Sequence, residues 1–206
     1  MKNVYFVQVD VSATIGAPSA YLPYTAGVLA AAAWESGVVK ENLQFKEFIF
    51  LREAIADVTA RMDKPFIVAF SNYCWNTEYN KRLAKAVKEK WQNCITVFGG
   101  HNVPDDFSFL ENFPYIDVLC HGEGEETVKR LLEALALNEP LDGVNNISFR
   151  KNGEYVRTDS SCPGEIEPYP SPYLEGWFDK IVDDHPEIAF NAILETSRGC
   201  PHKCAY

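Results

Sequence analysis

The chain has 206 residues, of which 47% are hydrophobic and 23% are charged, as in a globular protein with one sizeable core and an appended segment. Its net charge of −10 argues against nucleic acid or an anionic membrane as the main partner. The longest run of small residues, 26–34, is too short to cross a bilayer.

Strand-like and helix-like segments alternate through the first part of the chain. Short apolar runs of strand length occupy residues 4–9, 43–50, 66–70, 95–98 and 117–120. Helical patterns follow them, within residues 24–37, 51–62, 79–91, 107–112 and 128–135. Gly37 is expected to end the first helix. This alternation predicts an α/β fold, in which helices cover both faces of a parallel sheet.

Five strands and five helices of this length match a flavodoxin-like, doubly wound sheet with the strand order 2-1-3-4-5. The order is assigned by analogy with that fold. In such sheets, ligands bind beyond the carboxyl ends of the strands. We therefore expect functional side chains in the loops that follow the strands.

The end of the α/β domain is expected between residues 136 and 145, where Pro140 and Gly143 interrupt the helical pattern. A hairpin is predicted next, around the turn Asn152-Gly153, and a proline-rich linker follows it. A further strand is predicted at residues 188–194. The three expected parts are the α/β domain at 1–140, the hairpin and linker at 141–187, and a last part at 188–206.

Four of the predicted strand ends carry loops with candidate ligand-binding residues. No G-x-G-x-x-G or G-x-x-x-x-G-K-[ST] motif is present, so the dinucleotide and P-loop fingerprints are missing. Glycines in these loops allow a ligand to approach the backbone, a serine offers a hydroxyl, and aromatic rings offer an apolar wall. The candidates are Tyr21 after strand one, Ser71, Asn72, Tyr73 and Trp75 after strand three, Gly99, Gly100 and His101 after strand four, and Gly122, Glu123 and Gly124 after strand five.

Each set of candidates also has a purely structural explanation. Gly99 and Gly100 are compatible with a plain turn between a strand and a helix. The carboxylates at 123–126 are compatible with a helix N-terminus, where negative charge is favoured. Tyr73 and Trp75 are compatible with packing beneath a loop.

Taken in order, these loops resemble the cobalamin-binding domain that precedes the barrel of cobalamin-dependent radical S-adenosylmethionine (SAM) enzymes. The resemblance covers about residues 1–140 and implies a Rossmann-like cobalamin site. The nucleotide tail would lie near Ser71, Gly99 and Gly100, with the aromatic residues beside the corrin. Many cobalamin domains carry Asp-x-His-x-x-Gly after the first strand, but residues 10–16 here contain no histidine. We therefore expect no protein histidine on cobalt.

The sequence ends with two cysteines, Cys200 and Cys204, followed by Ala205 and Tyr206. This ending resembles the Cys-x-x-x-Cys-x-aromatic-Cys loop of radical SAM enzymes, with the third cysteine expected at position 207. The resemblance implies that the thiolates bind a 4Fe–4S cluster, and that residues 188–194 form the first strand of a radical SAM β/α barrel. From the residues alone, a zinc half-site, a disulfide and two unrelated thiols stay open.

The resemblance implies the N-terminal part of a larger enzyme with three cofactors: cobalamin, a 4Fe–4S cluster and SAM. Such enzymes cleave SAM reductively to a 5′-deoxyadenosyl radical and often transfer methyl groups to a small molecule or peptide. The chain alone is expected to be inactive. The other cysteines lack disulfide-scaffold spacing, so we expect a reducing, cytoplasmic setting.

Two alternative functions stay open. The first is a radical SAM protein whose N-terminal domain binds no cobalamin and acts as a docking module. The second is a non-catalytic, receiver-like α/β domain. A receiver would carry a phosphoacceptor aspartate at the end of the third strand, where Ser71 and Asn72 stand.

Overall fold

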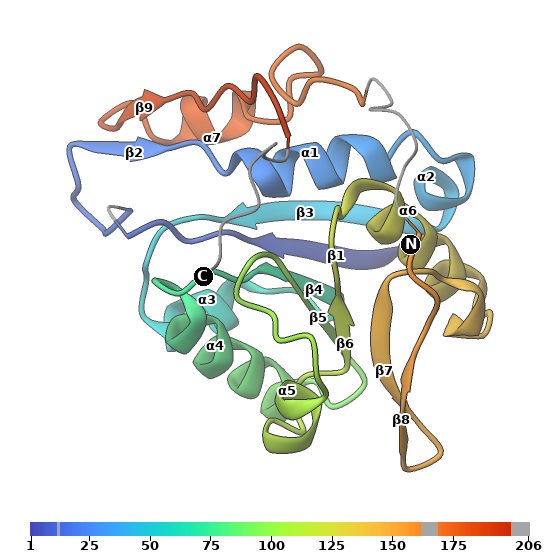
Figure 1. Cartoon of the computed structure of the whole chain (residues 1–206). Coiled ribbons are helices and arrows are strands. Elements are labelled where there is room, and N and C mark those ends of the chain that lie inside the picture. The colour runs from blue at the N-terminus through green and yellow to red at the C-terminus, as the bar shows by residue number, and fades with distance from the viewer. Residues whose placement is uncertain (12, 162–168, 199–206) are drawn as a thin grey trace, which may run out of the picture.

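The computed structural model describes residues 1–11, 13–161 and 169–198, and its main feature is a seven-stranded sheet (Figure 1). The strand order is β3-β1-β4-β5-β6-β7-β8. The first five strands are parallel and have the order 2-1-3-4-5 along the chain, so the prediction is confirmed. The bounds are β1 Lys2–Val7, β3 Leu43–Ile49, β4 Pro65–Ser71, β5 Ile95–Gly99, β6 Val118–Cys120, β7 Ile147–Lys151 and β8 Glu154–Arg157.

Helices cover both faces of the sheet and form two separate cores (Figure 1). Side chains alternate along a strand, so Val4 and Phe6 enter one core while Tyr5 and Val7 enter the other. This explains why the central strands are apolar throughout. The helices on the first face are α1 Tyr24–Ala33, α2 Gly37–Asn42 and α6 Glu125–Leu137, and those on the second are α3 Ile55–Arg61, α4 Thr77–Lys90 and α5 Ser108–Asn112. None of the helices in the described ranges has the length and apolar character needed to cross a membrane.

The prediction for Gly37 is wrong. Trp34 caps α1, and Gly37 is the first residue of α2. The N-cap of α2 is Ser36, whose hydroxyl accepts a hydrogen bond from the Val39 amide at 3.5 Å. Serine is a favoured N-cap residue, so this glycine follows a helix start signal instead of acting as a stop.

The predicted hairpin is present and belongs to the same sheet. Asn152 and Gly153 both have positive φ, at 53° and 87°, as a tight hairpin turn requires. The two strands of the hairpin are β7 and β8, and β7 pairs antiparallel with β6. A short 3₁₀ helix, η1 Leu141–Gly143, lies between α6 and the hairpin. The division of the chain at residue 140 stays a prediction.

The C-terminal segment, residues 169–198, lies on the outer side of α1 (Figure 1). It contains α7 Asp179–Asp184 and β9 Ala189–Asn191, which pairs in parallel with β2 Ser19–Tyr21. At Gly27 of α1, a Cβ atom would overlap the Phe178 ring. The small residues of α1 therefore allow close packing against the sheet on one side and this segment on the other.

Candidate functional site

Asparagine side chains tie together the loops at the carboxyl ends of the parallel strands. Asn76 Nδ2 donates to the carbonyl oxygens of Val9 and Ser71, each at 3.0 Å. Asn76 Oδ1 accepts from the Tyr73 amide at 2.8 Å. One buried amide thus fixes the loops that follow β1 and β4.

Asn72 extends this network to the loop after β5. Its amide donates to the Gly99 carbonyl at 2.6 Å, and its carbonyl accepts from the Asn102 amide at 3.1 Å. Its Nδ2 donates to the Asn102 carbonyl, also at 3.1 Å. The loops after β1, β4 and β5 therefore form one hydrogen-bonded rim.

A second buried asparagine of α4 lies beneath this rim. Asn80 Nδ2 lies 3.2 Å from Ser71 O and 3.3 Å from Asn72 Oδ1, whereas Asn80 Oδ1 has no hydrogen-bond partner among the described residues. Asn72, Asn76 and Asn80 are all 0% exposed. Sequence reasoning selected Asn72 but missed Asn76 and Asn80. Their i, i+4 spacing is the available signal, since Asn80 stands within the apolar stripe of an amphipathic helix.

The glycines of the loops differ in what their missing side chains permit. Gly100 has φ +107°, and a Cβ atom there would lie 2.8 Å from the Asn72 carbonyl oxygen. A Cβ at Gly99 would make an ordinary contact of 3.5 Å with Cys120. Gly122 has φ +66°, and a Cβ atom there would have no atom of a described residue within 4 Å. The close approach at Gly100 is thus to protein backbone.

Tyr73 and Trp75 form an exposed aromatic stack. Their ring centroids are 4.7 Å apart and the rings are 3° from parallel. Trp75 is 46% exposed, which does not fit packing beneath a loop. His101 lies 5.9 Å from the Tyr73 ring, and Tyr73 Oη lies 3.3 Å from Thr25 Oγ1. The structure thus brings three of the predicted residues together.

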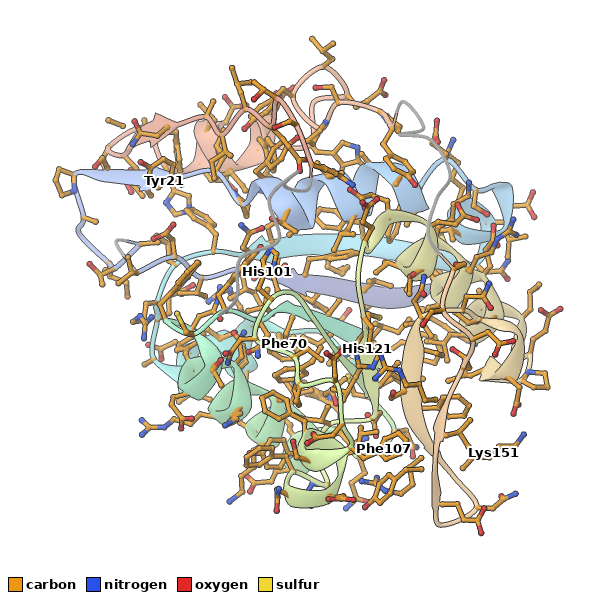
Figure 2. The ribbon with its side chains drawn as sticks, in the orientation of Figure 1. Tyr21, Phe70, His101, Phe107, His121 and Lys151 are labelled. Carbon is orange, nitrogen blue, oxygen red and sulfur yellow. The ribbon has the colours of Figure 1, made fainter. Side chains whose placement is uncertain are left out.

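The other predicted aromatic residue, Tyr21, lies on β2 outside the main sheet (Figure 2). Ser71 is the last residue of β4 and is 6% exposed. Its hydroxyl makes no hydrogen bond to any residue that the structure describes. The hydroxyl lies at the carboxyl end of a parallel strand, where ligands of such sheets bind.

His121 is the first residue after β6 and has a structural role. It is 9% exposed, and its Nε2 lies 2.9 Å from Ser148 Oγ of the hairpin. Burial lowers its pKa, and the nearby Arg157 acts in the same direction. The ring therefore links β6 to β7 in its neutral form.

The loop after β6 contacts the C-terminal segment through Arg198. The Arg198 guanidinium pairs with Glu125, with Glu195 at 2.9 Å and with Glu123 at 3.4 Å. Glu125 and Glu126 stand in the first turn of α6, as expected for carboxylates at a helix N-terminus. Gly124 precedes them, and a Cβ atom there would lie 2.8 Å from Leu29 of α1.

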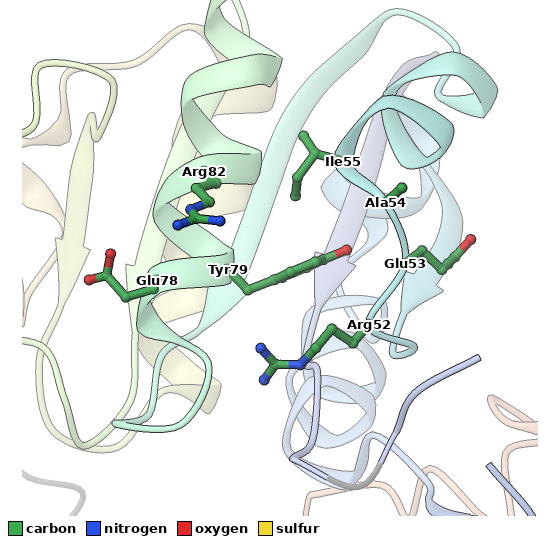
Figure 3. A pocket seen from close by; sticks show the side chains of 7 residues that line it. All are labelled: Arg52, Glu53, Ala54, Ile55, Glu78, Tyr79 and Arg82. Atoms are coloured by element: carbon green, nitrogen blue, oxygen red, sulfur yellow. The ribbon is translucent and has the colours of Figure 1, made fainter. Parts of the chain in front are cut away.

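Described residues line two surface depressions. One, of about 380 Å³, lies between α4 and the connection to α3, and the Tyr79 side chain extends across it (Figure 3). Burial raises the pKa of Tyr79 to about 12. The other, of about 370 Å³, lies between α1 and the C-terminal segment. Cys200 and Cys204 lie outside the described residues, and within the described ranges no group of three or more His, Cys, Asp or Glu side chains is placed to hold a metal.

The family model for the B12-binding domain matches residues 14–132, more than half of the chain. The chain belongs to this family. The matched range contains the asparagine network, the aromatic stack and the loop after β6. It thus places the strand-end loops within a domain type that is defined by cobalamin binding.

The most informative relatives are methyltransferases. Over 211 aligned residues, the chain is 36% identical to 2-(S-pantetheinyl)-carbapenam-3-carboxylate methyltransferase of Streptantibioticus cattleyicolor. It is 34% identical to the cobalamin-dependent radical SAM methyltransferase TokK of Streptomyces tokunonensis. Both alignments cover 100% of this chain but only 30% of the relative. The chain therefore spans less than a third of the length of these enzymes.

Solved structures of two cobalamin-dependent or radical SAM enzymes share the fold. OxsB with aqua-cobalamin and SAM bound has a TM-score of 0.69 at 23% identity, over 97% of this chain and 27% of OxsB. TsrM from Kitasatospora setae, with cobalamin and a [4Fe-4S] cluster bound, has a TM-score of 0.53 at 18% identity, over 84% of this chain and 32% of TsrM. At these identities the likeness concerns the fold alone.

Proposed function

We propose that the chain binds cobalamin at the carboxyl ends of its parallel strands, as the cobalamin-binding part of a radical SAM methyltransferase. The B12-binding family match over residues 14–132 supports this assignment. The observation that carries the site is the nearly buried Ser71 hydroxyl, which has no partner among the described residues and lies two positions before the exposed stack. A polar group for the nucleotide tail and an apolar surface for the corrin thus occur in one loop.

The residues in the loops at the carboxyl ends of the strands fit this cofactor. Ser71 would hydrogen-bond the tail, Gly122 would leave room for it, and the Tyr73–Trp75 stack would contact the corrin. When bound, cobalamin supplies a cobalt centre that carries a methyl group. The first loop, residues 10–23, holds no histidine. The electron paramagnetic resonance spectrum of the cob(II)alamin form should therefore lack nitrogen superhyperfine splitting from the protein.

For the whole protein, we propose reductive SAM cleavage at a 4Fe–4S cluster, followed by methyl transfer to a small molecule or peptide. Cys200 and Cys204 would supply two of the three thiolate ligands. The whole-chain similarity to TokK supports this proposal. The chain by itself should hold little stable iron, because two thiolates cannot bind three irons.

Absorbance titration with hydroxocobalamin, followed by gel filtration, tests the binding proposal. The chain should co-elute with the corrinoid. Trp75→Ala should weaken binding roughly two- to tenfold, the range expected for loss of an aromatic contact. The control is Trp91→Ala, which removes a partly buried tryptophan at the opposite end of α4.

A second arm uses cobinamide, which lacks the nucleotide tail. Ser71→Ala should lower the affinity for cobalamin while leaving that for cobinamide unchanged. If no corrinoid co-elutes with the folded wild-type chain, the docking-module alternative is favoured instead.

A further inference from the structure

The pairing of Arg198 with the loop after β6 joins two regions that are far apart in the sequence. The Arg198 side chain is 22% exposed, and that of its partner Glu125 is only 7% exposed. Glu123 and Glu195 complete a group of three carboxylates around one guanidinium. We name this group, Arg198 with Glu123, Glu125 and Glu195, the Arg198 cluster.

The ion pair with Arg198 stabilises Glu125 more than it would stabilise an exposed carboxylate, because the Glu125 side chain is buried. A buried charge that loses its only close counter-ion is strongly destabilising, because neither water nor another charge replaces that ion. Among the described residues, Arg198 is the one cation whose ion pair with Glu125 the structure shows. The position of the loop at 122–125 and that of residues 195–198 therefore depend on each other.

A second contact fixes the other end of the same short stretch. Tyr173 Oη donates to the Ile193 carbonyl and accepts from the Ile193 amide, both at 2.9 Å. Residues 193–198 are thus held at Ile193 by Tyr173 and at Arg198 by the carboxylates. In the sequence, Cys200 follows Arg198 by two residues.

We propose that Arg198 is a positioning residue that couples the cofactor loop at 122–125 to residues 193–198. The coupling rests on the proposed function, because it requires cobalamin to bind against Gly122. A ligand that orders this loop stabilises the Arg198 cluster and with it the stretch that precedes the cysteine pair. By thermodynamic reciprocity, ordering that stretch strengthens cobalamin binding by the same factor.

Hydrogen–deuterium exchange on the 206-residue chain tests the coupling, with Arg198→Met, Glu125→Gln and the double variant. Without ligand, exchange at residues 193–198 should accelerate roughly tenfold in each single variant. It should accelerate little further in the double variant, since the two single substitutions remove the same Arg198–Glu125 ion pair. Arg198→Lys should restore part of the protection because it keeps the charge. The control, Arg130→Met, removes an exposed arginine that pairs with Glu126 and Glu133 on the same helix and should change nothing at 193–198.

Adding hydroxocobalamin should slow exchange at residues 193–198 in the wild-type chain but not in Arg198→Met. If Arg198→Met exchanges like Arg130→Met, or if the two single effects simply add, the positioning role is overturned. If cobalamin binds but protects residues 193–198 equally in wild type and Arg198→Met, the coupling is overturned. Failure of the wild-type chain to bind any corrinoid would refute the proposed function and the coupling to cobalamin with it, whereas the ligand-free rates test the positioning role of Arg198 separately.

Discussion

Replacing Gly100 with alanine should destabilise the fold strongly, because the substitution introduces both backbone strain and a steric overlap at this position. The backbone has φ +107°, which lies outside the small left-handed region that L-residues can occupy. The added methyl group would also lie 2.8 Å from the carbonyl oxygen and 3.1 Å from the amide nitrogen of Asn72. The Asn72 amide donates to the Gly99 carbonyl, and the Asn72 carbonyl accepts from the Asn102 amide. These atoms therefore cannot move without loss of the hydrogen bonds that form the rim.

The size of the effect follows from adding the two costs. A residue forced into a sparsely populated backbone region costs about 1–3 kcal/mol. Overpacking by one methyl group against a fixed neighbour costs about 1–3 kcal/mol. Together they amount to roughly 2–6 kcal/mol, which corresponds to a decrease in melting temperature of roughly 4–24 °C for a domain of this size.

Gly122→Ala is the matched control. Its φ of +66° lies within the left-handed region, and no atom of a described residue lies within 4 Å of the added methyl group. It should lower the melting temperature by only roughly 2–4 °C, the effect of about 1 kcal/mol. Because the open space at Gly122 is where we place the ligand, this variant should instead weaken cobalamin binding. Thermal unfolding followed by circular dichroism measures both variants, and equal melting temperatures for the two would refute the reasoning.

Three further predictions concern the cores and the C-terminal segment. Burial raises the pKa of Cys94 and of Cys120 to about 12, so iodoacetamide at pH 8 should alkylate the exposed Cys74 before Cys94 and Cys120, as peptide mapping would show. Burial lowers the pKa of His121, so the unfolded chain binds the extra proton and stability should fall as the pH decreases through about 6.5. Urea unfolding at pH 7.5 and 5.5 should show a smaller pH effect in His121→Gln. Gly27→Leu should lower the free energy of unfolding by about 1–3 kcal/mol, because the leucine side chain would displace the Phe178 ring packed on α1. It should also increase proteolysis within residues 169–191, and an unchanged cleavage rate would contradict this packing role.

The sequence was sufficient to predict a doubly wound parallel sheet, and the strand order came from analogy with the flavodoxin-like fold. Strands buried on both faces are apolar at every position, and the alternation of such strands with amphipathic helices leaves few possible sheets. The strand predicted at residues 188–194 contains β9, whereas β2 was not separable from a loop in this way. Each has three residues, and their pairing joins positions about 170 residues apart, which no local pattern reports.

The candidate site was predictable at its surface but not beneath it. Glycines, aromatic residues and Ser71 at strand ends follow from the fold, since ligands of such sheets bind there. The i, i+4 spacing of Asn76 and Asn80 is only a weak local signal, because asparagine in the first turns of a helix is usually a solvated residue. Only the packed structure shows that their amides replace the backbone partners that the loops after β1 and β4 lack.

The path of the C-terminal segment explains why Arg198 lies beside the loop at residues 122–125. Helix α1 has small residues on both sides, so the segment packs directly on it and reaches the strand-end edge (Figure 1). There β9 pairs with β2, which belongs to the connection that leaves the carboxyl end of β1. Residues 193–198 lie beside the loop after β6, and we expect the Arg198 cluster to depend on the packing of the C-terminal segment on α1. For this reason Gly27→Leu and Arg198→Met should both accelerate exchange at residues 193–198, whereas only Gly27→Leu should also expose α1.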